Sequence, residues 1–318
     1  MLFINLSLIA ALELRINQIQ KDTVEAIVRN EKDVPVAILL PNTPFSRMKE
    51  DSLQVVQKGK RVKFVGQHVQ WDYEKVNSFY KTIQPGEIWT HNIDVSKIYN
   101  TVDGEAKVKL SFIYRECDFK DGKVFSCQLP VILQSEDILM KVKTHQRFKD
   151  LVPNYRTKNC WFLKWIKAKY AIRKYQQMQD AAIMDLKNGP SLAFEEYFGT
   201  NDTSAVLDTF LKAKSYKFDL ECGSSECTMD GIYAFVSPEQ PTIFVCNQFY
   251  KTDYSGYNSK PGVLIHESTH FRATGDTEDY AYGFLEARKL AIDNPDLAVK
   301  NADNYEYYAE RVFYKLKE

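Results

Sequence analysis

Two histidines near the C-terminus, His266 and His270, are four residues apart in the stretch GVLIHESTHFRATG. On a helix, positions i and i+4 lie on the same face about one turn apart, so both imidazoles would point to one place. Glu267 would flank that place, within reach of a water molecule held there. This H-E-x-x-H spacing is typical of a zinc site in which the glutamate acts as general base. The alternative is a solvated helix, which the apolar GVLI before His266 disfavours.

The third protein ligand has several candidates. A catalytic zinc ion usually has three protein ligands and keeps a fourth position for water. No histidine follows His270, so we expect a carboxylate to complete the site. The near acids are Asp276, Glu278 and Asp279, and Glu286 lies further on. Sequence spacing alone does not decide which of these four acids is the third ligand.

The elements that must position these residues lie in the C-terminal half. Residues 159–318 place apolar side chains mostly at helical spacing. Pro261 suits the first turn of the histidine helix, and Gly275 suits its end. GIYAFV and TIFVCNQF, separated by SPEQP, predict a β-hairpin. We therefore expect a mainly helical domain with a small sheet.

The N-terminal half has a different pattern. Residues 13–135 contain short alternating runs rich in Val, Ile and aromatic residues, at spacings close to those of a β-sandwich. Residues 136–158 are charged and lack strand periodicity, which predicts a linker. His68 and His91 are isolated in the strand-rich half, and we expect core or surface roles for them. The predicted fold class is α+β.

Composition limits the class of protein further. The 318 residues are 44% apolar, and 42 basic residues balance 42 acidic ones. A chain of this length and composition is expected to fold into two globular domains. The charge balance argues against nucleic acid or an anionic membrane as the main partner. No segment reaches 18 apolar residues, so we predict no transmembrane helix.

The first residues and the cysteines indicate an oxidising compartment. Residues 1–12, MLFINLSLIAAL, resemble the apolar region of a signal peptide, with a first strand as the alternative. The chain has six cysteines and no C-x-x-C pair. Cys117 and Cys127 flank a turn at Asp121-Gly122 and could be bridged across two strands. Cysteine spacing leaves 15 possible pairings. We predict a secreted protein.

The histidine motif and a following element together resemble a known family. The stretch DTEDYAYG is similar to the G-T-x-D-x-x-Y-G element of the aspzincins, which include deuterolysin and the peptidyl-Lys metalloendopeptidases. Thr277, Asp279, Tyr282 and Gly283 match it, whereas Asp276 replaces its first glycine. The resemblance implies that Asp279 is the third ligand of one zinc ion. It also implies that Tyr282, three residues after Asp279 and close to it on a helix, stabilises the oxyanion.

The resemblance extends to most of the C-terminal domain. It implies a zincin-type fold with disulfides Cys160–Cys222 and Cys227–Cys246. The N-terminal region is similar to the family's propeptide. We therefore expect a secreted zinc endopeptidase made as a zymogen, with polypeptide substrates. The N-terminal domain would act as an intramolecular inhibitor or chaperone, and we expect a monomer.

A second motif bears on specificity. Asp303 and Glu306 are three residues apart in NADNYEY, so their carboxylates could converge on a helix, although a solvated acidic face has the same pattern. The motif resembles the N-A-D-x-x-E-Y element of peptidyl-Lys family members, whose two acids line the S1′ pocket. The resemblance implies cleavage of X-Lys bonds. The alternatives are a broad, deuterolysin-like protease and a non-catalytic secreted binding protein built on the sandwich domain.

Overall fold

The computed structural model describes residues 12–46, 48–73, 78–114, 117–120, 123–127, 131–145, 156–227 and 229–316. They form two compact units. Unit 1 comprises Met1–Gly66 and Val76–Gln146, and unit 2 comprises Gln67–Lys75 and Arg147–Glu318. The predicted signal-peptide segment, 1–12, lies outside the described residues except for Leu12, which begins the first strand.

Unit 1 is built from antiparallel strands. Its sheets have the orders β1-β2-β8, β12-β9-β4-β5 with β13 also on β9, β3-β7 and β10-β11. The strands are β1 (Leu12–Gln20), β2 (Thr23–Asn30), β3 (Val36–Leu39), β4 (Leu53–Gln57), β5 (Lys60–Arg61), β7 (Tyr80–Ile83), β8 (Ile88–Asp94), β9 (Gly104–Tyr114), β10 (Cys117–Lys120), β11 (Lys123–Cys127), β12 (Val131–Gln134) and β13 (Ile138–Val142). A short 3-10 helix, Pro44–Ser46, and a short helix α1, Val95–Ile98, complete the unit.

Alternation of side chains explains the core of unit 1. In β2 the side chains of Val24, Ala26 and Val28 are fully buried, while their neighbours along the strand are more exposed. They share one hydrophobic core with Val55 of β4 and Val108 of β9. The two larger sheets therefore enclose a common core, as in a sandwich, and the predicted α+β class is confirmed.

Strand β13 lies where the sequence predicted a linker. Met140 and Val142 pair with residues of β9 and are buried, whereas Lys141 between them is exposed. The segment is therefore an alternating strand, in which Leu139 and Lys141 are exposed while Met140 and Val142 are buried. Because one of its exposed residues is apolar, the sequence does not show a clear apolar–polar alternation.

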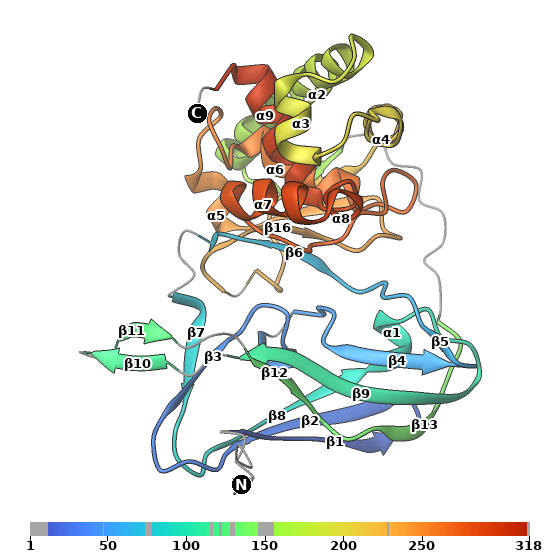
Figure 1. Ribbon diagram of the computed structural model, residues 1–318, viewed down its shortest axis with the longest axis vertical. Helices are drawn as coiled ribbons and strands as arrows, with labels where there is room; N and C mark the ends of the chain where they lie inside the picture. Colours follow the sequence, from blue (N-terminus) through green and yellow to red (C-terminus); the bar gives the residue numbers. More distant parts are fainter. Residues whose placement is uncertain are drawn as a thin grey trace, which may run out of the picture. The chain divides into compact units, whose positions relative to one another are not determined.

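Unit 2 packs helices on a mixed sheet of order β14-β15-β17-β16-β6 (Figure 1). The predicted hairpin is present as β16 and β17. The strands are β6 (His68–Trp71), β14 (Thr157–Lys158), β15 (Asp219–Glu221), β16 (Ile232–Val236) and β17 (Thr242–Val245). The helices are α2 (Phe162–Lys187), α3 (Leu192–Phe198), α4 (Ser204–Ser215), α5 (Asn247–Lys251), α6 (Lys260–Thr269), α7 (Phe284–Asp293), α8 (Pro295–Ala298) and α9 (Ala302–Tyr314).

Strand β6 is distant in sequence from the rest of unit 2. It pairs antiparallel with β16, so that Val69 lies opposite Phe235. Asp72 N–H extends the pairing by donating to the carbonyl of Gly231 at 2.7 Å. From the sequence we predict this segment to belong to the N-terminal domain, because no local pattern indicates a strand partner more than 150 residues away.

Two disulfides fasten unit 2, in the pairing that the family resemblance implied. Cys160 is bonded to Cys222 near the start of α2, and Cys227 is bonded to Cys246 before α5. Strands β10 and β11 place the backbone of Cys117 opposite that of Cys127. The side chains of this last pair lie outside the described residues.

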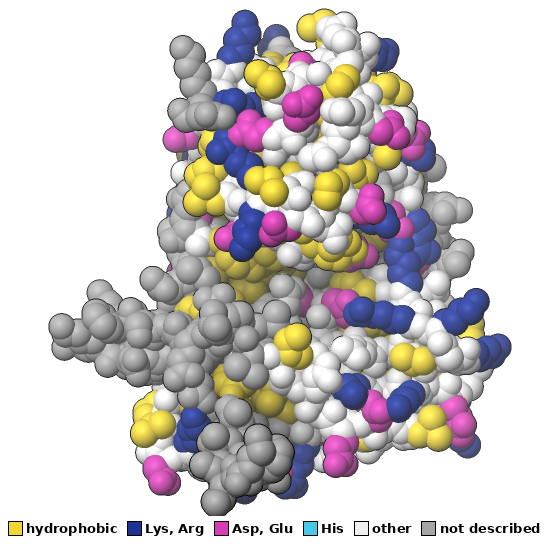
Figure 2. All heavy atoms as spheres, in the orientation of Figure 1, with side chains coloured by type: hydrophobic (Ala, Val, Ile, Leu, Met, Phe, Trp, Pro, Cys, Tyr) yellow, Lys and Arg dark blue, Asp and Glu magenta, His cyan; other side chains and the backbone are white. Residues whose placement is uncertain are grey.

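Surface features agree with the balanced composition. Acidic and basic side chains are intermixed on the face drawn in Figure 2. Among the residues that the structure describes, none of the helices combines the length and apolar character needed to cross a bilayer.

Candidate metal centre

Helix α6 presents the two histidines. Ser259 caps its N-terminus, where the side-chain oxygen accepts a hydrogen bond from Gly262 N–H at 3.1 Å, and Pro261 lies in the first turn. His266 and His270 are fully buried, and their Nε2 atoms are 3.1 Å apart. The helix ends earlier than the predicted Gly275.

The early end of α6 has a local cause. Thr274 Oγ1 donates to the carbonyl oxygen of Ser268 at 2.7 Å, and Thr274 N–H donates to that of Phe271 at 2.9 Å. These bonds satisfy carbonyl groups that a further helical turn would have used. The next residue but one, Asp276, has a φ of 51°. This is the left-handed conformation that glycine adopts most easily and aspartate adopts at modest cost. Asp276 therefore adopts a backbone conformation that suits the glycine which it replaces in the motif.

The turn returns Asp279 to the two histidines. Its Oδ1 atom lies 3.3 Å from His266 Nε2 and 3.4 Å from His270 Nε2. A tetrahedral zinc ion with bonds of about 2.0–2.1 Å holds its ligand atoms about 3.3–3.4 Å apart. The three atoms therefore match one face of a zinc coordination tetrahedron. Glu286, by contrast, is an exposed residue of α7.

Both histidines have an oxygen atom close to their second ring nitrogen. His270 Nδ1 donates to the carbonyl oxygen of Thr277 at 2.9 Å, and His266 Nδ1 lies 2.7 Å from Asp303 Oδ1. Such partners leave the Nε2 lone pair of each ring available to a metal, which is the usual arrangement of metal-binding histidines. The two imidazole nitrogens and the Asp279 oxygen, with oxygen atoms close to the second nitrogen of each ring, are therefore suited to bind zinc.

Burial and charge shape the acid–base properties of the site. Burial strongly raises the pKa of Glu267, and nearby Asp279 and Asp303 act in the same direction. Burial also opposes ionisation of Asp279, but the two imidazoles outweigh it and lower the pKa of that carboxyl. Neither carboxylate oxygen of Glu267 has a hydrogen-bond partner among the described residues, although both are buried. A buried carboxylate in this condition is suited to bind a water at the metal.

Tyr282 lies on a loop and not on the helix that its spacing suggested. Asn301 fixes this loop, because its Oδ1 accepts hydrogen bonds from Tyr280 N–H and Ala281 N–H at 2.7 and 3.0 Å. Gly283, with a φ of 87°, ends the loop at the start of α7. The ring of Tyr282 stacks on that of Tyr73, with centroids 4.4 Å apart.

Asp303 and Glu306 are both buried on α9, near the first histidine. Besides its contact with His266, Asp303 accepts a hydrogen bond from Gly283 N–H at 2.6 Å. Glu306 Oε2 lies 3.6 Å from His266 Nδ1 and accepts a hydrogen bond from Gln70 Nε2 at 2.5 Å. Burial raises the pKa of Glu306, and the neighbouring carboxylates raise it further. Asp303 thus contacts a candidate metal ligand, His266, which the sequence motif did not indicate.

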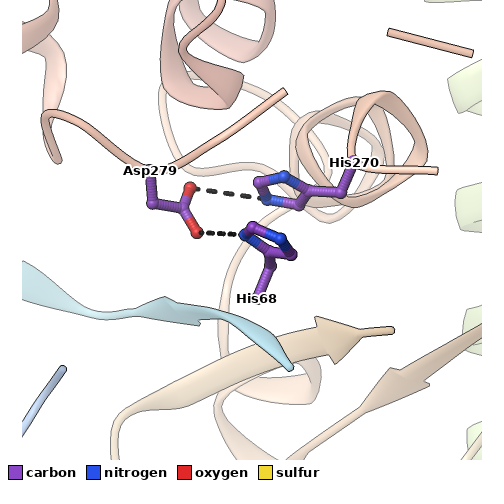
Figure 3. Close-up of side chains that lie close together, drawn as sticks. All are labelled: His68, His270 and Asp279. Carbon is purple, nitrogen blue, oxygen red and sulfur yellow. Dashed lines mark ion pairs between the residues drawn. The ribbon is translucent and has the colours of Figure 1, made fainter. Parts of the chain in front are cut away.

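His68 is a site neighbour to which the sequence analysis gave no chemical role. Its Nδ1 lies 3.6 Å from Asp279 Oδ2, and its ring stacks on His270 with centroids 4.4 Å apart (Figure 3). His68, His270 and Asp279 offer potential ligand atoms within 4.8 Å of one another. No local sequence pattern indicates this position of His68, because β6 reaches the site by pairing with the distant strand β16.

The chain is similar to known metalloendopeptidases. Residues 186–310 match the family model for the aspzincin M35 family, described as lysine-specific metallo-endopeptidase. The chain is 45% identical over 111 residues to a peptidyl-Lys metalloendopeptidase of Armillaria mellea, covering 34% of this chain and 31% of that protein. It is 39% identical over 121 residues to a peptidyl-Lys metalloendopeptidase of Pleurotus ostreatus, covering 37% of this chain and 72% of that protein.

A longer alignment includes both units. A neutral protease 2 homologue of Arthroderma gypseum is 24% identical over 324 residues, which covers 92% of this chain and 85% of that protein. The chain belongs to the aspzincin M35 family of metalloendopeptidases. Its matched segment spans about a third of the length of the Armillaria relative.

Proposed function

We propose that this protein is a secreted zinc endopeptidase that cleaves polypeptides at bonds preceding lysine. The triangle formed by His266 Nε2, His270 Nε2 and Asp279 Oδ1, with edges of 3.1 to 3.4 Å, carries the metal part of the proposal. When zinc is bound there, it supplies a coordinated water of lowered pKa and polarises the scissile carbonyl.

Proton transfer is the proposed role of Glu267. Its buried carboxylate adjoins the metal ligands, where it would take a proton from the attacking water and deliver it to the leaving amine. Burial raises the pKa of Glu267, which makes its carboxylate a stronger proton acceptor than an exposed glutamate. Tyr282 would donate a hydrogen bond to the developing oxyanion.

Lysine preference is assigned to the acidic pair on α9. Glu306 already accepts a hydrogen bond from a nitrogen donor, the amide of Gln70, at 2.5 Å. A lysine ammonium would make the same contact with an added charge, and a charge-assisted hydrogen bond is stronger than a neutral one. Asp303 adds negative charge beside Glu306 but is already engaged with His266. We therefore assign the larger part of lysine recognition to Glu306.

A broad, deuterolysin-like preference is the second candidate. The neutral protease 2 homologue aligns over both units and so favours it, whereas the higher-identity relatives favour lysine. A non-catalytic binding protein would have no use for a buried Glu267 that lacks hydrogen-bond partners among the described residues.

Mapping of cut sites tests the proposal. The mature form of the protein should cut a denatured substrate protein before lysine, and a zinc chelator should stop cleavage. Glu306→Gln should lose the lysine preference, whereas Glu286→Gln, an exposed acid on α7, should retain it. Chelator-sensitive cuts at unrelated residues would support the broad protease instead. Cuts that persist in chelator would refute the zinc mechanism.

The two disulfides favour an oxidising compartment. Together with the signal-like N-terminus they are the basis for proposing secretion, and the N-terminal strands are the proposed inhibitory propeptide.

A further inference from the structure

We infer that β6 is an internal blocking strand: Gln67–Tyr73 occupies the substrate position of unit 2, and His68 closes the open coordination position of the metal. The inference deepens the proposed function and rests on it. It assigns latency to particular side chains of a segment that is separated in sequence from the rest of its unit.

The backbone of β6 binds as an added strand. Strand β16 lies between β17 and β6 in the sheet, so β6 covers the edge that β16 would otherwise present. Extended peptides commonly bind proteins by adding a strand to such an edge, where main-chain hydrogen bonds give affinity and alternate side chains enter pockets. Helix α6, which carries the histidines, contacts both β6 and β16. A substrate strand on β16 would therefore pass the metal ligands.

His68 is the first side chain that β6 brings to the centre. Its Nδ1 faces Asp279 Oδ2 at 3.6 Å, and its Nε2 lies 3.8 Å from Glu278 Oε2. With three protein ligands, a catalytic zinc ion keeps one position for water or substrate. An imidazole in that position would displace the water on which peptide hydrolysis depends. The ring is buried and stacked on His270, so it is positioned in advance for this role.

Gln70 is the second side chain. Residues i and i+2 of a strand point to the same face, and Gln70 follows His68 by two. Its buried amide donates to Glu306, the acid to which we assign lysine recognition. Gln70 therefore stands where a lysine after the cut would stand, and the 69–70 peptide bond corresponds to the bond to be cleaved. A neutral glutamine in this place gives a weaker contact than lysine and is a poor substrate residue.

Further contacts fix the strand at both ends. Gln67 Nε2 donates to Glu226 at 2.9 Å, and Gln248 Nε2 donates to Asp72 at 2.9 Å. Beyond Asp72, the ring of Tyr73 covers the ring of Tyr282, the proposed oxyanion donor. The blocking strand thus engages the metal ligands, the specificity acid and the oxyanion tyrosine together.

Cleavage of the chain does not by itself release β6. A cut between residues 145 and 156 would separate the N-terminal segment from the rest of unit 2, but β6 would remain bound through its hydrogen bonds and buried side chains. We expect latency to persist until the N-terminal fragment dissociates.

The test uses the intact chain carrying Glu267→Gln, so that it cannot cleave itself. His68→Phe keeps the ring and its stacking but removes both nitrogens, and His91→Phe is the matched control in unit 1. Cobalt(II) is substituted for zinc, and its visible absorption reports the ligands. His68→Phe should change the spectrum and weaken cobalt binding about tenfold or more, because a ligand is lost. His91→Phe should change neither.

A second measurement follows binding of a labelled X-Lys peptide by fluorescence anisotropy. The parent chain should exclude the peptide, and the double variant His68→Phe, Gln70→Ala should bind it. An unchanged cobalt spectrum in His68→Phe, or peptide binding by the parent chain, would overturn the inference. If no variant binds cobalt, the proposed function fails first, and the inference fails with it. A further outcome is that the cobalt spectrum changes in His68→Phe while the double variant binds peptides with and without lysine equally well. This result would support blocking by β6 and refute the assignment of lysine recognition to Glu306.

Discussion

The substitution Asp303→Asn separates the two roles that the sequence and the structure give to this residue. The resemblance places Asp303 in the S1′ pocket, whereas the structure places its Oδ1 2.7 Å from His266 Nδ1 and its Oδ2 2.6 Å from Gly283 N. Asparagine has nearly the same shape but carries no charge. It offers one acceptor oxygen in place of two, so one of the two contacts is lost or weakened.

The expected magnitude follows from the role of a carboxylate behind a metal-binding histidine. Loss of such a partner usually weakens metal affinity about 10- to 100-fold. That change corresponds to about 1.4–2.8 kcal/mol of binding free energy, at about 1.4 kcal/mol for each factor of ten. The upper part of the range applies here, because the side chains of both His266 and Asp303 are buried and water cannot screen their interaction.

The assay is competition for zinc between the protein and a chromophoric chelator. Glu306→Gln is the matched control, since it replaces an ionisable carboxyl of the same helix at 3.6 Å from His266 Nδ1, which is too far for a hydrogen bond. We expect it to alter zinc affinity by less than about threefold and to abolish lysine preference. Wild-type zinc affinity in Asp303→Asn, together with loss of lysine preference, would show that Asp303 lines the pocket and does not orient His266.

Three further changes have defined outcomes. Glu267→Gln should retain zinc and lose turnover by at least about a hundredfold, because the proton acceptor is removed; loss of zinc measured by atomic absorption would contradict its assignment as base. Ser259→Ala should lower the free energy of unfolding by about 1–2 kcal/mol in urea titrations, because α6 loses its cap at Gly262 N–H; an unchanged urea midpoint would contradict this. Burial raises the pKa of Glu310 from 4.5 to about 8, so its folded form binds more protons than the unfolded chain between those values. Stability should therefore fall as pH rises from 5 to 8, by at most about 1.4 kcal/mol per pH unit from this group, and Glu310→Gln should flatten that slope.

Local features of the sequence predicted much of the site. The i, i+4 spacing of His266 and His270 requires only one helical turn to bring both rings to one face, so the two histidines were predicted to lie together without knowledge of the fold. Short-range motifs likewise predicted the hairpin of β16 and β17, the Pro261 helix start and the sandwich-like strands of unit 1. The choice of Asp279 among four acids needed the family resemblance, because ligand selection depends on how the chain turns after α6. The left-handed conformation of Asp276 makes that turn.

The contacts that side chains of the site make with distant segments of the chain depend on the tertiary structure. Asp303 reaches His266 because α9 packs against α6, and no spacing within NADNYEY could distinguish this contact from a pocket wall. His68 read as an isolated histidine because its partners are about 200 residues away in sequence. Its position is set by the pairing of β6 with β16, and main-chain hydrogen bonds of that kind carry almost no sequence signature. Local spacing thus predicts the donor residues of the candidate centre, whereas the long-range packing of β6 and α9 decides which side chains surround those donors.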